Sequence, residues 1–341
     1  MSGMIAVVIS IAVTVVCWGV YGPVLHRGQA AMLHSSLRPF ICVGLAYFLI
    51  GVLAPGGYLW SQGERGRWSM MGTIWSLAAG AAGALGALGI IMAFFFNGRP
   101  VFVMPLVFGG APVINSLLTM YWTKSFRRAS PIFVAGLILV ITGAVTVLVS
   151  KPRPPATQAT VDTTQWPMVL LSIAVAILCW GAYGPVLHKG QMKMEGSRLR
   201  PLICVGLAYF VIAVVIPGLM LLAGIEATQG EETLRFTTTG ALWSLAAGGA
   251  GAIGALGIIM AFNSGGKPIY VMPLVFGGAP VVNTMITVVG SGLLGEVSPI
   301  FYAGLIVTIV GAVTVLIFAP RSHATPPSQK PEQQAVPKSA T

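Results

Sequence analysis

Long apolar segments dominate this chain and decide what it can fold into. A helix of about 20 residues crosses the hydrocarbon core of a bilayer, and ten segments are that long. They cover residues 4–25, 38–59, 71–94, 101–123, 130–149, 167–187, 200–222, 239–262, 269–290 and 298–318. A membrane β-strand needs only about 10 residues of alternating character, so these lengths favour helices. The sequence therefore predicts an all-α membrane protein with ten transmembrane helices.

Charged residues are rare and stay outside these segments. Only 8% of the 341 residues are charged, whereas a soluble chain carries about a quarter. All eight Asp and Glu residues fall in connections or tails, so no predicted span contains a carboxylate. The net charge of +11 comes from Lys and Arg scattered over short loops, which argues against a nucleic-acid-binding face. We expect a lipid bilayer as the surroundings of this chain, and no nucleic acid as a partner.

The distribution of basic residues predicts the orientation in the membrane. With the N-terminus inside, 13 of the 19 Lys and Arg residues lie on the cytoplasmic side. The positive-inside rule then places both termini in the cytoplasm. The first segment has no basic region before it, and its motif returns in the sixth segment, so we expect a permanent helix here and not a signal peptide. We expect an integral protein of the plasma (inner) membrane.

The chain contains an internal repeat. CWGVYGPVLHRGQ (17–29) returns as CWGAYGPVLHKGQ (179–191), and LRPFICVGLAYF (37–48) returns as LRPLICVGLAYF (199–210), both 162 residues on. VMPLVFGGAPV and SPIF recur 168 residues on, which places six extra residues near the acidic connection 223–238. Each half contains five spans, and an odd number predicts that the second half is inverted in the membrane.

The repeat sets the expected domain boundaries. The first five-helix repeat covers residues 1–150 and the second covers 167–320. A polar, Pro-rich linker at 151–166 joins them. Residues 321–341 are polar, and we expect a disordered cytoplasmic tail there.

The fourth and ninth segments are interrupted by GGAP at their middle. Gly/Pro-interrupted spans at matching positions of two halves point to a transporter site. The residues that this interpretation assigns to the site are Gly110, Pro112, Asn115, Gly278, Pro280 and Asn283. The alternative is that Pro kinks these helices and Gly permits close packing.

Two aromatic pairs belong to the same repeat. Trp18 and Trp180 lie just past the middle of their spans, where a ring can stack on a planar or sugar-like solute. Tyr21 and Tyr183 lie almost one turn further on and are candidates for the same site. For all four the competing interpretation is an aromatic belt at the membrane interface, which suits the two tyrosines better than the deeper tryptophans.

Four titratable residues lie at span edges in both copies. His26, His188, Arg38 and Arg200 are candidates for a proton or anion site. Alternatively they reach the headgroups and are structural. The four cysteines lie within spans without CxxC or Cys/His spacing, and we expect neither a metal nor a cofactor. Glycines repeat every three residues from Gly80 and from Gly248, which predicts close helix packing.

Taken together, these features resemble the drug/metabolite transporter superfamily, in particular its EamA-type members. The resemblance rests on Trp-Gly in the first helix of each half, Arg near the start of the second, Pro within the fourth and a Gly-rich fifth helix. Leu-Gly-Glu ending at Glu296 matches the family before the last helix, but the first half has TKSFRRAS and lacks this glutamate. Glu296 is equally well placed to cap that helix.

The resemblance implies secondary transport of a small metabolite across the membrane. The absence of charge from the spans favours a sugar- or nucleoside-like solute. A passive channel or facilitator, an exporter of amino acids or drugs, and a non-transporting scaffold remain alternatives. An enzyme is not expected, because no span contains a pair of acids, a Ser/His/Asp set or a metal cluster.

Overall fold

The computed structural model describes residues 2–64, 66–150, 163–225, 235–264, 268–290, 292, 295 and 297–318. These residues are helical or lie in short connections, and no strand occurs among them. Most of the predicted linker, the insertion in the acidic connection, Glu296 and the tail lie outside the described residues.

The helices follow the predicted segments closely. In chain order they are α1 (Ser2–Ala30), α2 (Leu37–Phe48), α3 (Ala54–Gln62), α4 (Met70–Phe95), α5 (Pro100–Thr123), α6 (Pro131–Val149), α7 (Trp166–Lys193), α8 (Leu199–Tyr209), α9 (Ile216–Leu222), α10 (Thr238–Asn263), α11 (Pro268–Gly290) and α12 (Pro299–Phe318). The π-helical turns η1 (Leu49–Leu53) and η4 (Phe210–Val215) join α2 to α3 and α8 to α9. Each of these joined pairs forms one predicted span.

Eight of the helical segments in the described residues are long and apolar enough to cross a membrane. Shorter apolar helices cover 131–147 and 274–290, at two further predicted segments. This is the architecture of an all-α integral membrane protein, as the composition predicts.

The repeated SPIF motif explains where α6 and α12 begin. The Ser130 and Ser298 hydroxyls accept hydrogen bonds from the backbone N–H groups of Phe133 and Phe301, at 3.1 and 3.2 Å. The proline that follows each serine suits the first turn, where no intrahelical donor is needed. The local sequence therefore determines where α6 and α12 begin.

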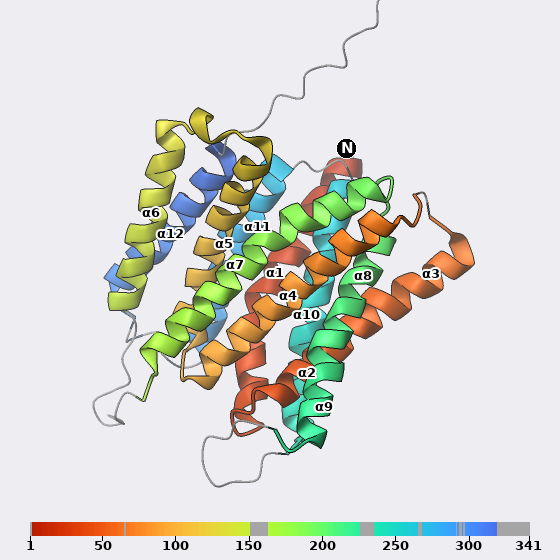
Figure 1. Cartoon of the computed structure of the whole chain (residues 1–341). Coiled ribbons are helices and arrows are strands. Elements are labelled where there is room, and N and C mark those ends of the chain that lie inside the picture. Colours follow the sequence, from red (N-terminus) through yellow and green to blue (C-terminus); the bar gives the residue numbers. More distant parts are fainter. Residues whose placement is uncertain are drawn as a thin grey trace, which may run out of the picture.

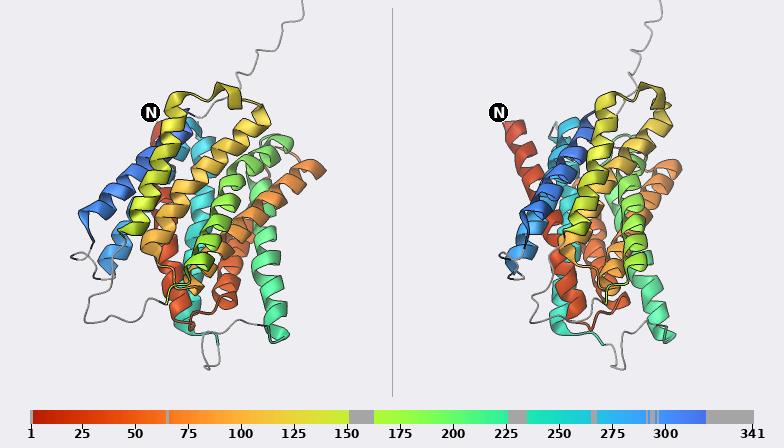
Figure 2. Two further views of the ribbon diagram at one scale, coloured as in Figure 1. Left: turned by 60° about the vertical axis from the view of Figure 1, so that its left-hand side comes forward. Right: turned by 90° about the vertical axis from the view of Figure 1, so that its left-hand side faces the viewer.

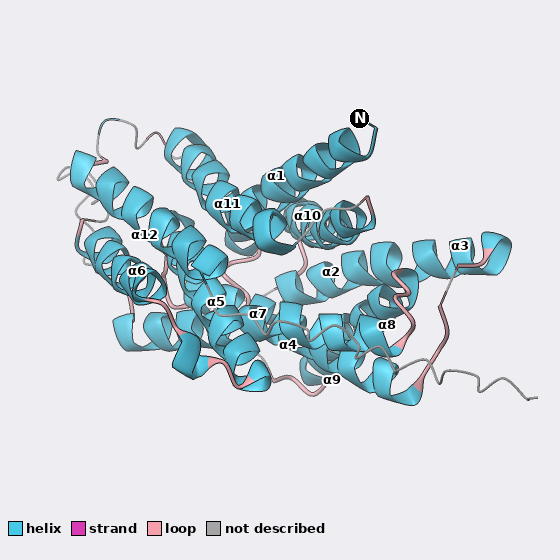
Figure 3. Ribbon diagram, turned by 90° about the horizontal axis from the view of Figure 1, so that it is seen from above, coloured by secondary structure: helices cyan, strands magenta, loops and turns pink. Residues whose placement is uncertain are grey.

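The two halves of the sequence pack into each other. The pairs α1 with α10, α4 with α7 and α6 with α12 lie side by side (Figures 1 and 2). Seen from above, α6 and α12 lie at one side of the bundle and α2, α3, α8 and α9 at the other (Figure 3). Helices from both halves therefore surround its centre.

The two ends of the bundle are distinct. The first helix descends from the labelled N-terminus, and α7 runs in the opposite direction (Figure 1). We call the end at which α1 begins and α5 and α7 end the N-terminal end. The end at which α1 ends and α5 and α10 begin is the opposite end.

Glycine stripes bring the helices close together, as the sequence predicts. A Cβ atom on Gly80 would lie 2.7 Å from Val205 Cα of α8, and one on Gly248 would lie 2.7 Å from Val43 Cα of α2. Both distances are too short for a real contact, and both neighbours are backbone atoms that cannot rotate away. Only glycine permits these approaches.

Gly80→Ala or Gly248→Ala should therefore lower the stability of the folded protein by about 1–3 kcal/mol, because the added methyl forces α4 from α8 or α10 from α2. Thermal unfolding in detergent measures this. The matched control is Gly56→Ala in α3, where no heavy atom lies within 4 Å of the new methyl. That change should be neutral or raise stability by about 0.5–1 kcal/mol. Equal losses in all three variants would contradict close packing as the role of the stripes.

Candidate functional site

A cavity of about 270 Å³ lies among eight helices, α1, α2, α4, α5, α7, α8, α10 and α11. Eight of the described residues that line it are aromatic, and these eight come equally from both halves of the sequence. The aromatic residues are Trp18, Tyr21, Tyr47, Phe108, Trp180, Tyr183, Tyr209 and Phe276. They form four pairs related by the sequence repeat, so the centre of the cavity is nearly symmetric.

Two tryptophans are held in place by the glycine stripes. The indole N–H of Trp18 donates to the carbonyl of Gly251 at 3.3 Å, and that of Trp180 donates to Gly83 at 3.1 Å. A Cβ atom at Gly254 or Gly86 would overlap these indole rings. The stripes therefore make room for the cavity wall as well as for neighbouring helices.

Two tyrosines meet where α2 crosses α8. The rings of Tyr47 and Tyr209 are stacked, with centroids 3.8 Å apart and an interplanar angle of 1°. Close backbone contact makes this possible, since a Cβ atom on Gly206 would lie 3.1 Å from the carbonyl carbon of Gly51. The stacked pair joins equivalent helices of the two halves at the cavity wall.

The polar residues of the cavity break the symmetry. Asn115, Thr119, His188 and Gln191 line it toward the C-terminal ends of α5 and α7, at the N-terminal end of the bundle. Their repeat counterparts Asn283, Thr287, His26 and Gln29 do not line it. The cavity therefore opens at the N-terminal end, where His188 is exposed.

The opposite end is sealed by buried side chains. Asn283 and Gln29 are both 0% exposed. The Asn283 amide donates to the carbonyl of Pro100 at 3.1 Å, and the Gln29 amide donates to that of Ile91 at 3.1 Å. The His26 ring packs edge-on against Phe94, with centroids 5.1 Å apart.

The connection after α1 adds to this seal. The ring of His34, in this connection, packs edge-on against the ring of His26, with centroids 6.2 Å apart. Burial lowers the pKa of His34 below its usual range, which favours the neutral ring at pH 7.

The structure brings together six of the residues that the sequence nominates. Trp18, Trp180, Tyr21, Tyr183, Asn115 and His188 line the cavity. Tyr21 is only 4% exposed, which does not fit an interfacial belt. Its hydroxyl is buried and has no hydrogen-bond partner among the described residues. These residues form the candidate site.

The GGAP motifs are nearby but do not line the cavity. A Cβ atom on Gly110 would meet Ile177 of α7 at 2.6 Å, and one on Gly278 would meet Val15 of α1 at 2.8 Å. Pro112 and Pro280 are buried. Their place supports the packing interpretation, because each glycine faces a neighbouring helix.

The two arginines also lie away from the cavity wall. The Arg38 guanidinium lies over the ring of Phe236, 5.6 Å from its centroid. Arg200 pairs with Glu64, with Nη1 and Oε2 3.3 Å apart, and both side chains are 14% exposed. These contacts favour structural roles over a solute-binding one.

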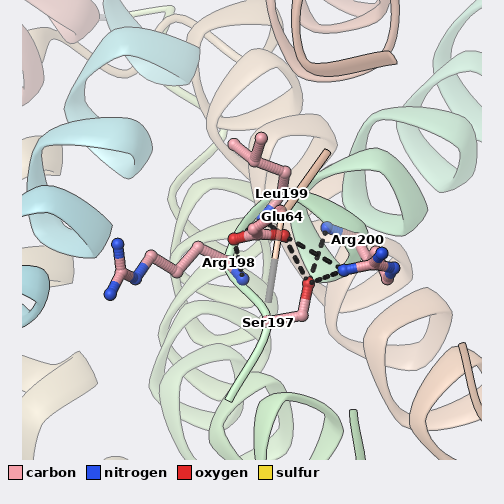
Figure 4. Close-up of polar contacts among 5 residues, drawn as sticks. All are labelled: Glu64, Ser197, Arg198, Leu199 and Arg200. Carbon is pink, nitrogen blue, oxygen red and sulfur yellow. Dashed lines mark hydrogen bonds and ion pairs between the residues drawn. The ribbon is translucent and has the colours of Figure 1, made fainter. Parts of the chain in front are cut away.

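Glu64 also caps the N-terminus of α8 (Figure 4). Its carboxylate accepts hydrogen bonds from the backbone N–H of Arg198 at 2.8 Å and from the Ser197 hydroxyl at 2.7 Å. A carboxylate is stabilising at this end of a helix dipole. The connection between α3 and α4 is thereby fixed to the second half of the chain.

Several residues of the cavity wall were not among the site residues predicted from the sequence. They are Tyr47, Tyr209, Phe108, Phe276, Thr119 and Gln191. All six have an identical counterpart in the other copy of the repeat, and Thr119 and Gln191 belong to the copy at the open end. An aromatic residue retained in mid-span in both copies was the available signal.

Charge and metal ligands are scarce here. No Asp, Glu, Lys or Arg lines the cavity among the described residues. Within the same ranges, no three His, Cys, Asp or Glu side chains form a metal-binding group. What the cavity offers a ligand is aromatic faces, hydroxyls and amides.

Comparison with known proteins finds no matching protein-family model and no matching curated protein. The residues and geometry of the cavity are therefore what point to a function.

Glu64→Gln should lower the free energy of unfolding by roughly 1–3 kcal/mol, because it removes a buried charge-assisted acceptor from α8 and Arg200. The matched control is Glu195→Gln. Glu195 pairs with Arg67 at 3.9 Å, but these side chains are 63% and 84% exposed. Exposed pairs contribute little, so the control should unfold like the wild type. Thermal unfolding in detergent compares the two, and equal effects would argue against the capping role.

Proposed function

We propose that this protein is a secondary transporter that carries a small, neutral polar metabolite across the membrane by alternating access. The observation that carries the proposal is the cavity, with a nearly symmetric aromatic centre, one open end and one sealed end. A carrier needs such a site near the middle of the membrane, reached from one side at a time. The resemblance to EamA-type drug/metabolite transporters points to the same activity.

The proposal includes ten spans in two inverted repeats. It counts the shorter helices α6 and α11 as spans, together with the eight long ones. The opposite directions of α1 and α7 are what an inverted pair requires (Figure 1). With both termini in the cytoplasm, as the basic residues predict, the cavity faces the cytoplasm in this conformation.

The sealed end favours a carrier over a passive channel. A channel needs a continuous polar path, whereas Gln29, Asn283 and Leu25 are all 0% exposed at the opposite end. A change of conformation is therefore required before solute can pass. The side-chain amides of Gln29 and Asn283 donate hydrogen bonds to backbone carbonyls, which supports a stable closed end.

Size and chemistry of the cavity favour a sugar- or nucleoside-like solute. Pockets for drug-sized ligands measure about 300–1,000 Å³, and this one measures about 270 Å³. Trp18 and Trp180 provide faces for stacking on a ring. The amides of Asn115 and Gln191 and the Thr119 hydroxyl, which line the cavity, can bond to solute hydroxyls.

A second candidate solute is a small organic cation. Clustered aromatic rings attract quaternary ammonium groups through cation–π interactions without needing a carboxylate. The aromatic wall would suit such a solute, as in an exporter of cationic drugs.

Thermal-shift screening of the purified protein tests the site and separates these solutes. The panel contains sugars, nucleosides, amino acids and organic cations. A ligand at about 100 times its Kd stabilises the folded state by about 2.7 kcal/mol. Trp18→Ala and Trp180→Ala should each weaken binding about tenfold or more, since each removes a stacking face.

The matched control is Trp60→Ala, because Trp60 is 94% exposed and does not line the cavity. It should leave the ligand response unchanged. Counterflow of the bound solute in proteoliposomes then tests transport. Binding without flux, or a ligand response that Trp60→Ala abolishes and the cavity variants retain, would overturn the proposal.

A further inference from the structure

Each end of the molecule contains the same two amides, but only one end uses them to close. We propose that Asn283 and Gln29 form a hydrogen-bonded latch at the opposite end, and that Asn115 and Gln191 form its equivalent at the N-terminal end in the alternate conformation. The inference rests on the proposed alternating access and names the residues that hold each state.

The existing latch joins helices that must separate for this end to open. Asn283 of α11 donates to Pro100, the first residue of α5, at 3.1 Å. Gln29 near the end of α1 donates to Ile91 of α4 at 3.1 Å. Both amides are 0% exposed. Breaking either bond without a replacement would leave buried polar groups unpaired, which is costly.

The repeat supplies every part of a second latch. The offset of 168 residues relates Asn283 to Asn115 and Pro100 to Pro268, and it relates Ile91 to Ile259. The offset of 162 relates Gln29 to Gln191. Asn115, Gln191 and Ile259 all line the open cavity. These three members of the second set therefore face the cavity, and Pro268 begins α11.

Packing beside the closed latch is tight. A Cβ atom on Gly22 of α1 would lie 2.5 Å from Met104 Cγ of α5 and 3.2 Å from Asn283 Oδ1. The first helix therefore lies directly against α5 and the latch amide of α11 at the closed end.

The same amide pair then serves two purposes in turn. In the conformation described, Asn115 and Gln191 offer polar groups to the cavity while Asn283 and Gln29 close the far end. In the alternate conformation, Asn115 donates to the Pro268 carbonyl and Gln191 to the Ile259 carbonyl. Asn283 and Gln29 would then face the cavity from the other side.

Thiol labelling in lipid nanodiscs tests the latch, because both faces of the protein are accessible there. The background replaces Cys17, Cys42, Cys179 and Cys204. Thr119→Cys reports on the N-terminal end and Thr287→Cys on the opposite end. These reporters are repeat counterparts: Thr119 lines the cavity, and Thr287 is 8% exposed. The rate ratio with a water-soluble maleimide measures which end is open.

Asn283→Ala and Gln29→Ala should each raise labelling at position 287 and lower it at 119, by a few-fold to about tenfold for one lost hydrogen bond. Adding Asn115→Ala to Asn283→Ala, or Gln191→Ala to Gln29→Ala, should return the ratio toward the wild type. The Asn283 and Gln29 variants test the latch independently. Gel filtration shows whether a variant is folded, and if one of the two misfolds, the other still tests the latch.

An unchanged ratio in the single variants, or a double variant that moves further from the wild type, would overturn the latch. Solute counterflow separates this result from failure of transport itself. A wild type that transports while the amide variants keep its ratio contradicts the latch alone. A protein that shifts its ratio as expected, yet moves no solute, supports the latch and contradicts the transporter.

Discussion

Close contact between the glycine faces of α4 and α10 and the helices beside them underlies the whole arrangement. In a bilayer, helix association depends on packing and on hydrogen bonds, since lipid is as apolar as the side chains. Glycine lets Trp18 and Trp180 lie against the backbone of these helices and donate to the carbonyls of Gly251 and Gly83. The same contact that holds the helices together therefore positions the aromatic wall of the cavity.

The aromatic residues at the centre of the cavity are related by the repeat, whereas the two ends of the cavity differ. Each aromatic residue of the wall has a counterpart from the other half, so the centre can keep its chemistry in two conformations. At the ends, Asn283 is buried and hydrogen-bonded while Asn115 lines the open mouth. For the proposed transporter, alternating access requires two states that use equivalent residues and differ in which end is closed.

The charged side chains of Glu64, Arg200 and Arg38 lie outside the cavity. Glu64 and Arg200 fix a connection to the start of α8, and Arg38 contacts Phe236, all away from the cavity wall. Within the described residues, the wall itself uses rings, hydroxyls and amides. Such groups can release a neutral solute as readily as they bind it, because no buried ion pair must form or break.

The amino-acid sequence by itself determined the helical membrane class, because segment length and the rarity of charge follow directly from the bilayer. It also contains the repeat, and it nominated the two tryptophans that line the candidate cavity. It could not show that Tyr47 stacks on Tyr209, or that Gly110 and Gly278 face neighbouring helices, since these contacts join residues far apart in the chain. Nor could it show which end is closed. Nearly identical copies carry the same local preferences, and only the packing of α1 against α4 and α5 decides which copy is buried.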